Sequence, residues 1–375
     1  MTEHSRTFSP SAAARLLACP PSGKLCAEYP DETSEYAKQG TDAHALCQYL
    51  VEKSLGSEAK DPTPELEYYD QEMQDCAESY CEFVQEKITQ AKETCKDPVV
   101  LVEQRLDFSR YAQEGFGTGD CIIVADETLS VIDFKYGLGV LVDADMNPQM
   151  LCYALGALEL FDGIYDIESI TMTIFQPRRE NISSFTISKE DLLKWATEVL
   201  EPAAKLVASG GGEFHAGSHC QFCKARAQCR KRAEYNLEMA KYDFAMPDTL
   251  DPDEITYILT RSAELQAWAS DVQEYALKQA LQGTKYEGFK IVESKSNRKY
   301  TDETAVAKAV IDAGFDPYEQ KLKGITAMTS TLGAKKFETI LGKLVVKPKG
   351  KPALVPESDK RPAMNTAQED FKDKE

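Results

Sequence analysis

The chain has 375 residues, and its 62 acidic side chains outnumber the 43 Lys and Arg side chains, which gives a formal net charge of −19. At about 100–200 residues per domain this length predicts two or three folded units, and a hydrophobic fraction of 42% can supply their cores. No apolar run approaches the roughly 18–20 residues of a membrane span, and the N-terminal residues lack the apolar stretch of a secretory signal. We therefore expect a cytoplasmic protein without membrane contact. The net charge alone argues against a polyanionic partner.

Residues 7–60 are predicted to be mainly helical, with one helix from Ala12 to Leu17 and a second over 34–51. Residues 61–86 contain nine acidic residues and no Lys or Arg, and their apolar side chains recur at helical spacing. This pattern predicts an amphipathic helix with an acidic outer face. A solvated surface is the simpler interpretation of that face, and a protein-binding surface is the alternative.

Short β-branched runs then predict strands over 99–103, 121–124, 129–133 and 170–175, with a turn at Asp126 that makes the middle two a hairpin. Helices are expected over 147–160, where Asn147 and Pro148 form the start, and over 191–208. Because strands alternate with helices, we expect one α/β unit over residues 1–245, including the N-terminal helices and a late cysteine group.

The chain changes character after Met246. Residues 246–285 predict a long helical connector, 286–346 a small α+β module, and 347–375 a basic, polar tail. Residues 321–361 contain ten Lys or Arg and three acidic residues, a local charge of +7 within a protein of −19. Contact with phosphate groups and a solubilising role are equally good interpretations of this charge. Because the positive charge is gathered in one segment, the net charge of the whole chain no longer argues against a nucleic-acid partner.

A candidate catalytic group lies in the predicted hairpin. Asp133 and Lys135 are two residues apart on one strand, so both side chains leave the same face, and Asp120 begins the neighbouring strand after two glycines. Paired carboxylates repel unless a cation lies between them, and their oxygens suit Mg²⁺ or Mn²⁺. A metal, a water and a nearby lysine are the parts needed to hydrolyse a phosphodiester. The D-x-K spacing alone is a weak signal.

Three further features strengthen this hypothesis. Glu103 ends an upstream strand and can add a carboxylate, and His44 on the second helix can add an imidazole ligand. Gln149 and Tyr153 are four residues apart and so share one face of the helix that follows the D-x-K strand. Taken singly, the histidine and this pair are more simply explained by ordinary packing.

Eleven cysteines are present, an odd number that argues against a disulfide framework in a reducing compartment. Most are expected to be buried apolar residues, but Cys220, Cys223 and Cys229 lie within ten residues and among basic side chains. A fourth ligand must come from elsewhere. Cys19, which precedes Pro20, is the leading candidate and Cys26 competes with it. Four thiolates suit a [4Fe–4S] cluster or Zn²⁺, and His215 or His219 offers a zinc site with three cysteines.

The order of these motifs along residues 9–235 resembles the RecB-like branch of the PD-(D/E)XK nuclease superfamily, which includes the CRISPR-associated RecB-like exonucleases and the AddB-type repair nucleases. The C-terminal part resembles an uncharacterised phage and prophage family that carries this nuclease domain. The resemblance implies a restriction-endonuclease-like α/β core, in which a central mixed sheet is flanked by helices. It also implies a [4Fe–4S] cluster that joins the N-terminal helices to the end of the nuclease domain.

The resemblance further implies a role for each matching residue. Metal coordination is assigned to four residues, of which the last contributes its carbonyl: His44, Asp120, Asp133 and Phe134. Glu103 would assist there and Lys135 would be catalytic. The cluster ligands would be Cys19, Cys220, Cys223 and Cys229. Gln149 and Tyr153 would position DNA, and Arg178 and Arg179, which follow a strand, are expected to guide it. Asp133 stands where many relatives have Glu, and the proline of the first motif is absent.

The leading hypothesis is a Mg²⁺- or Mn²⁺-dependent DNA exonuclease in phage or prophage recombination or replication, acting on single-stranded or end-containing DNA. A phage recombinase or a single-strand-binding protein is a compatible partner, as is a second copy of the chain. The first alternative is a non-catalytic module that binds DNA ends or a recombinase and retains the fold and the cluster. The second is a structural protein held together by zinc.

Overall fold

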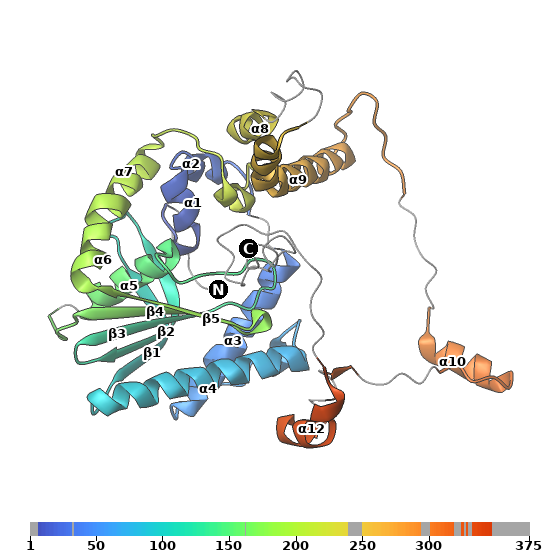
Figure 1. Ribbon diagram of the computed structural model, residues 1–375, viewed down its shortest axis with the longest axis horizontal. Helices are drawn as coiled ribbons and strands as arrows, with labels where there is room; N and C mark the ends of the chain where they lie inside the picture. Colours follow the sequence, from blue (N-terminus) through green and yellow to red (C-terminus); the bar gives the residue numbers. More distant parts are fainter. Residues whose placement is uncertain are drawn as a thin grey trace, which may run out of the picture. The chain divides into compact units, whose positions relative to one another are not determined.

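The computed structural model describes residues 7–31, 34–161, 163–238, 250–293, 301–318, 324, 325, 328 and 332–346 (Figure 1). The chain divides into two compact units, Met1–Gln282 and Gly283–Glu375. The first unit contains the sheet and its helices. The predicted basic tail over 347–375 lies outside the described residues, as does much of the basic segment before it.

A five-stranded mixed sheet forms the centre of the first unit, in the order β1-β2-β3-β4-β5. Only β3 and β4 are parallel, and the other neighbouring pairs are antiparallel. The α/β class with a central mixed sheet flanked by helices is therefore confirmed. The strands are β1 (Val99–Asp107), β2 (Phe116–Ala125), β3 (Thr128–Phe134), β4 (Ser169–Gln176) and β5 (Asn181–Ser188).

Helices cover both faces of this sheet (Figure 1). On one face α3 (Glu35–Ser54) and α4 (Gln71–Thr94) pack together, and the buried side of α4 carries Tyr80 and its apolar neighbours while its acidic residues face outward. The opposite face is covered by the N-terminal helices and by the later ones: α1 (Ala13–Ala18), α5 (Pro148–Phe161), α6 (Lys189–Trp195) and α7 (Glu201–Ser209). A π-helical turn, Ala196–Leu200, joins α6 to α7.

Helix α5 is the crossover between the two parallel strands, and it begins as its sequence predicts. The side chain of Asn147 accepts hydrogen bonds from the backbone N–H of Gln149 at 3.0 Å and of Met150 at 3.4 Å, and Pro148 occupies the first turn. These contacts satisfy N–H groups that have no partner within the helix. The helix therefore starts immediately after the loop that leaves β3.

A glycine lets α5 approach β1 closely. A Cβ atom on Gly156 would lie 2.8 Å from the Cβ of Leu106 and 2.9 Å from its carbonyl carbon. We expect Gly156→Ala to lower the free energy of unfolding by about 1–3 kcal/mol, because the helix must move away from the strand. Gly40→Ala in α3 is the control, since nothing lies within 4 Å of its added methyl and the gain should be about 0.5–1 kcal/mol. Equal denaturation midpoints for the two variants would contradict this packing.

The remaining elements are helical. In the first unit α2 (Ser22–Ala27) follows α1, and α8 (Arg230–Leu237) packs against α9 (Pro252–Leu281), the long helix predicted for the connector. The second unit contains α10 (Glu303–Asp312) and α12 (Ala334–Leu341), and its described residues include no strand, so the predicted β part of an α+β module is not found there. The short 3₁₀ turns are η1 (Pro10–Ala12), η2 (Thr63–Glu65), η3 (Pro177–Arg179), η5 (Ser218–Phe222) and η7 (Gly342–Leu344). None of the described helices combines the length and apolar character needed to cross a bilayer.

Candidate active site and cysteine pocket

The pairing of three strands brings the predicted carboxylates together at one end of the sheet. Val102 pairs with Cys121 and Gln104 with Gly119, so Glu103 on β1 faces Asp120 on β2. Glu103 has a φ of 49°, which is rare for a non-glycine residue and is typical of strained positions at functional sites.

Asp133 reaches the same end of the sheet from β3, one residue beyond the last paired position of the β2–β3 hairpin. The N–H of the next residue, Phe134, donates a 2.6 Å hydrogen bond to Oδ2 of Asp120. Alternation along β3 directs Asp133 to the face that α5 covers, where its Oδ1 accepts a hydrogen bond from Gln149. The Phe134 ring is buried on the opposite face against Tyr80, so only the backbone carbonyl of Phe134 is available as the predicted metal ligand.

His44 completes the group from α3. Its Nδ1 lies 3.2 Å from Oδ1 of Asp120 and 4.0 Å from Oε1 of Glu103. One ligand atom from each of these three residues lies within 4.8 Å of the other two. We call His44, Glu103 and Asp120 the carboxylate cluster. One imidazole and two carboxylates at this spacing are a suitable donor set for a divalent cation.

Without a cation the carboxylate cluster holds protons. Burial tends to lower the pKa of His44, but the negative charge of Asp120 and a hydrogen bond to it outweigh burial and raise the pKa to about 9. Burial and the charge of Asp120 raise the pKa of Glu103 to about 7. Burial would also raise the pKa of Asp120, but the His44 charge lowers it below the usual range. His44 and Glu103, the two groups with raised pKa values, must therefore release protons when a metal binds.

This exchange makes a pH prediction. At pH 7 His44 is protonated and Glu103 is close to half protonated, and both must lose protons to coordinate Mn²⁺. We expect Mn²⁺ affinity to rise with pH, by about tenfold per unit between pH 7 and 9 and more steeply below pH 7, where two protons are released. Calorimetry in buffers of different ionisation enthalpy measures the proton release. An affinity independent of pH across this range would contradict the assignment of His44 as a ligand.

Asp133 belongs to a second group, in which it is paired with Lys135. Lys135 Nζ lies 2.9 Å from Oδ2 of Asp133 and 3.3 Å from Oε1 of Gln149. The Gln149 amide donates in turn to Oδ1 of Asp133 at 3.3 Å and to the Tyr153 hydroxyl at 3.1 Å. Burial tends to lower the pKa of Lys135, but the charge of Asp133 outweighs it and raises the pKa, which keeps the side chain cationic.

The structure thus brings together most of the predicted catalytic and substrate-positioning residues. The carboxylate cluster and the Asp133–Lys135 pair adjoin each other through Asp120 and Phe134. A Cβ on Gly117, which pairs with Leu106 near the start of β2, would lie 2.6 Å from Pro10 and 2.9 Å from the Tyr153 ring, which explains a glycine beside the site. Gln149 and Tyr153 project toward this end of the sheet from α5, as their spacing predicts.

The two predicted DNA-guiding arginines differ in their surroundings. Arg178 makes two hydrogen bonds to the Glu72 carboxylate, at 3.1 and 3.0 Å, and its guanidinium stacks over Tyr136. Arg179 is exposed and donates to the carbonyl of Leu138 at 3.2 Å. A DNA contact by Arg178 therefore requires its ion pair to open, while Arg179 is the more accessible of the two.

A buried glutamine near the site was not predicted. Gln176, 1% exposed at the end of β4, donates to the carbonyls of Gly137 and Val140 at 2.8 Å each. It therefore shapes the loop that connects Lys135 to α5. The only sequence signal was its place between a strand and Pro177, which does not reveal a partner about 40 residues earlier.

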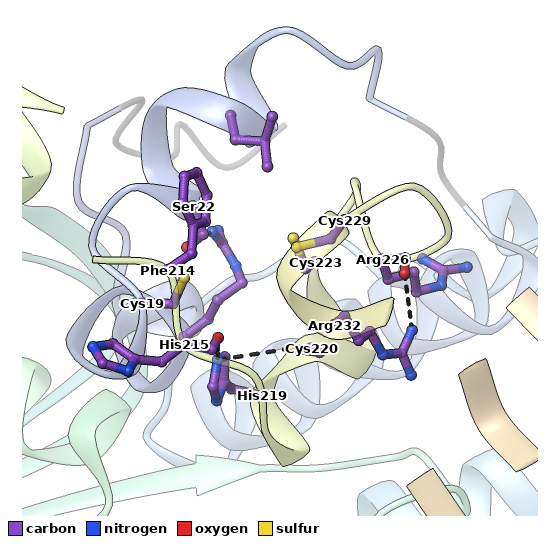
Figure 2. Close-up of a pocket in the computed structure, with 12 residues that line it drawn as sticks. Cys19, Ser22, Phe214, His215, His219, Cys220, Cys223, Arg226, Cys229 and Arg232 are labelled. Carbon is purple, nitrogen blue, oxygen red and sulfur yellow. Dashed lines mark hydrogen bonds between the residues drawn. The ribbon is translucent and has the colours of Figure 1, made fainter. Parts of the chain in front are cut away.

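The predicted cluster cysteines lie around a second site, the cysteine pocket. Cys19 follows α1, Cys220 lies in η5, Cys223 follows η5, and Cys229 precedes α8; all four line the pocket (Figure 2). Three arginines also line it, namely Arg15, Arg226 and Arg232, and no Asp or Glu is among its lining residues. Four thiols surrounded by fixed positive charge suit an anionic metal–thiolate group.

Cys26, the alternative fourth ligand, does not line the cysteine pocket but contacts Cys223, which does. Its Sγ is 3.6 Å from Sγ of Cys223. The hydrogen bond with Cys223 lowers the pKa of Cys26 to about 5 and raises that of Cys223. Cys19 instead makes a hydrogen bond with His219, which raises the histidine pKa. Both cysteines therefore remain candidate ligands, Cys19 because it lines the pocket and Cys26 because it contacts Cys223.

The spacing of the sulfur atoms bears on the kind of metal. A tetrahedral zinc site with Zn–S bonds of about 2.3 Å holds its sulfurs roughly 3.8 Å apart. Among the described residues, which include every cysteine, no three cysteine sulfurs lie within 4.8 Å of one another. A closed set of thiols at zinc-like spacing is therefore not found among the described residues, although the Cys26–Cys223 pair has such a separation.

Comparison with known proteins identifies the family but not an activity. The solved structure titled "Crystal structure of SSO0001" matches with 14% identity over 52% of this chain and 98% of that one, at a TM-score of 0.22 that supports no inference about fold. The model of a family described as "Protein of unknown function (DUF2800)" matches residues 4–362, nearly the whole chain. The chain therefore belongs to the DUF2800 family.

Proposed function

We propose that this protein is a Mg²⁺- or Mn²⁺-dependent DNA nuclease of the RecB-like PD-(D/E)XK type, with a restriction-endonuclease-like core. The observation that carries the proposal is the arrangement of the carboxylate cluster beside the Asp133–Lys135 pair at one end of a mixed sheet. These are the cation ligands and the fixed positive charge that phosphodiester hydrolysis requires.

The roles follow from the contacts. A bound Mg²⁺ or Mn²⁺ would polarise the scissile phosphate and activate a water molecule. His44, Glu103 and Asp120 would hold it, and Asp133 adjoins them. The raised pKa of Lys135 favours a cationic role over that of a base, so Lys135 would stabilise charge on the phosphate oxygens. Gln149 keeps the lysine in position through its hydrogen bonds to Lys135 and Asp133.

The cysteine pocket supports a [4Fe–4S] cluster, with Zn²⁺ as the alternative. Four thiolates and a [4Fe–4S] core carry net negative charge, which the three lining arginines would offset. The pocket joins the N-terminal α1 and α2 to the segment after α7, which are nearly 200 residues apart in sequence. Such a cluster would hold the two ends of the nuclease unit together.

DNA is the proposed substrate, single-stranded or with free ends, in phage or prophage recombination or replication. The acidic outer face of α4 would repel the backbone, so the substrate would approach through the lysine and the metal. Binding should accordingly be weak, strongly salt-dependent and promoted by the divalent cation.

Digestion of linear and covalently closed circular single-stranded DNA of the same sequence, with Mn²⁺, tests the proposal. An exonuclease degrades only the linear form and releases nucleotides from one labelled end first. Cleavage of the circle would identify an endonuclease and overturn the exonuclease assignment. Binding of DNA ends without any cleavage of either form would favour the non-catalytic alternative.

A further inference from the structure

Arg232 on α8 is the most completely buried charged side chain among the described residues, with 0% exposure. It lies three residues after Cys229 and lines the cysteine pocket (Figure 2). A buried guanidinium is costly unless its charge and its N–H groups are satisfied. The partners of Arg232 therefore indicate which parts of the molecule depend on it.

Helix α9 supplies the partners that face away from the pocket. Arg232 Nε donates to Glu264 at 2.6 Å, and one terminal nitrogen donates to Asp271 at 2.5 Å. Arg226, which also lines the pocket, donates to the other oxygen of Asp271 at 2.8 Å. Both acidic residues belong to α9, so two arginines of the pocket wall link α9 to the segment that carries the late cysteines.

The other side of Arg232 faces the cysteines. Its positive charge favours the thiolate of Cys220, opposing the effect of burial, which raises the pKa of that thiol overall. The second terminal nitrogen, Nη2, is buried and has no hydrogen-bond partner among the described residues. An anionic metal–thiolate group in the pocket would give this nitrogen an acceptor and would balance the charge of Arg226 and Arg232.

We propose that Arg232 is a positioning residue that couples the metal in the cysteine pocket to the docking of α9. The proposal rests on the cluster assigned above, but not on nuclease activity. Ligation of the metal by Cys229 fixes the start of α8. The negatively charged metal–thiolate group then keeps the Arg232 guanidinium where it can bind Glu264 and Asp271. Loss of the metal leaves a buried cation with acceptors on one side only, so α9 is released.

Hydrogen–deuterium exchange of α9 tests this coupling in the full-length protein, purified anaerobically and compared with the same protein after iron removal by a chelator. Removal of iron should speed exchange of α9 amides at least tenfold in the wild type. In Arg232→Gln the exchange should be fast in both states and insensitive to iron. Glu264→Gln, which removes the charge of a half-buried partner on α9 and leaves Arg232 in place, should show the same insensitivity and serves if Arg232→Gln does not fold.

Arg261→Gln is the matched control. Arg261 also joins α9 to the end of α8, through Glu238 directly after that helix at 2.8 Å, but it does not line the cysteine pocket. Its loss should speed α9 exchange in both states while the dependence on iron remains. If the protein binds iron and sulfide but exchange of the α9 amides does not change when they are removed, the coupling is overturned and the cluster assignment stands. A protein that binds neither iron nor sulfide would overturn both the coupling and the cluster.

Discussion

Asp120→Asn is expected to reduce Mn²⁺-dependent DNA hydrolysis on the order of 10³-fold or more. Asp120 is the residue that links the two halves of the site, because its carboxylate lies 3.2 Å from His44 and accepts the N–H of Phe134. Asparagine has nearly the same shape but removes the negative charge on which cation binding depends. Initial rates of nucleotide release and Mn²⁺ binding by calorimetry should both show the loss.

Glu159→Gln is the control for this substitution. Glu159 lies near the C-terminal end of α5 and pairs with the exposed Arg110. Glu159→Gln therefore changes the net charge by the same amount as Asp120→Asn without altering the site. Its activity should stay within about twofold of wild type, since an exposed ion pair of this kind contributes about 0–1 kcal/mol. Wild-type activity in Asp120→Asn would rule out this carboxylate as a metal ligand.

Cys223→Ser is expected to abolish binding of iron and sulfide and to lower stability. A group that binds only the folded protein at 1,000 times its dissociation constant contributes about 4 kcal/mol, and this contribution disappears with the ligand. The brown colour expected of anaerobically purified wild type should be absent, and the melting temperature should fall by several degrees. Metal analysis and thermal unfolding measure the two effects.

Cys81→Ser provides the comparison. Cys81 is remote from the cysteine pocket, and its thiol donates to the carbonyl of Leu50, which a serine hydroxyl can also do. Its iron content should equal that of wild type. Full iron and sulfide in Cys223→Ser would show that this residue is not a ligand. A colourless wild-type protein that contains zinc would favour the structural alternative.

The central part of the fold was predictable because its signals are local. Apolar runs marked β1 to β4, and Asn147 with Pro148 marked the start of α5. β5 was missed because it is an edge strand in which Ser and Thr alternate with apolar residues, as in Ser183 and Ser184 before Phe185, so its hydrophobic run is interrupted. The α+β prediction for residues 286–346 relied on weak patterns, and the described part of this segment contains helices and irregular chain but no strand.

The candidate site was predictable wherever its residues share a strand or a helix. The D-x-K pair and the Gln149–Tyr153 pair follow directly from period two and period 3.6. The approach of His44 to Asp120 depends on how α3 packs against the sheet, and no local pattern encodes that. The pairing of Arg178 with Glu72 and the contact between Cys26 and Cys223 are long-range in the same way, so no local pattern reveals them.

The most direct test of the proposed function is the rate at which a 5′-labelled single-stranded oligonucleotide is hydrolysed with Mn²⁺, by wild type and by Asp133→Ala. Asp133 is 2% exposed and holds Lys135 at 2.9 Å, so its loss removes both a carboxylate and the position of the lysine. The account predicts Mn²⁺-dependent hydrolysis by wild type that EDTA stops, and none by a folded Asp133→Ala variant. Equal hydrolysis by the two proteins, or none by wild type, would contradict it.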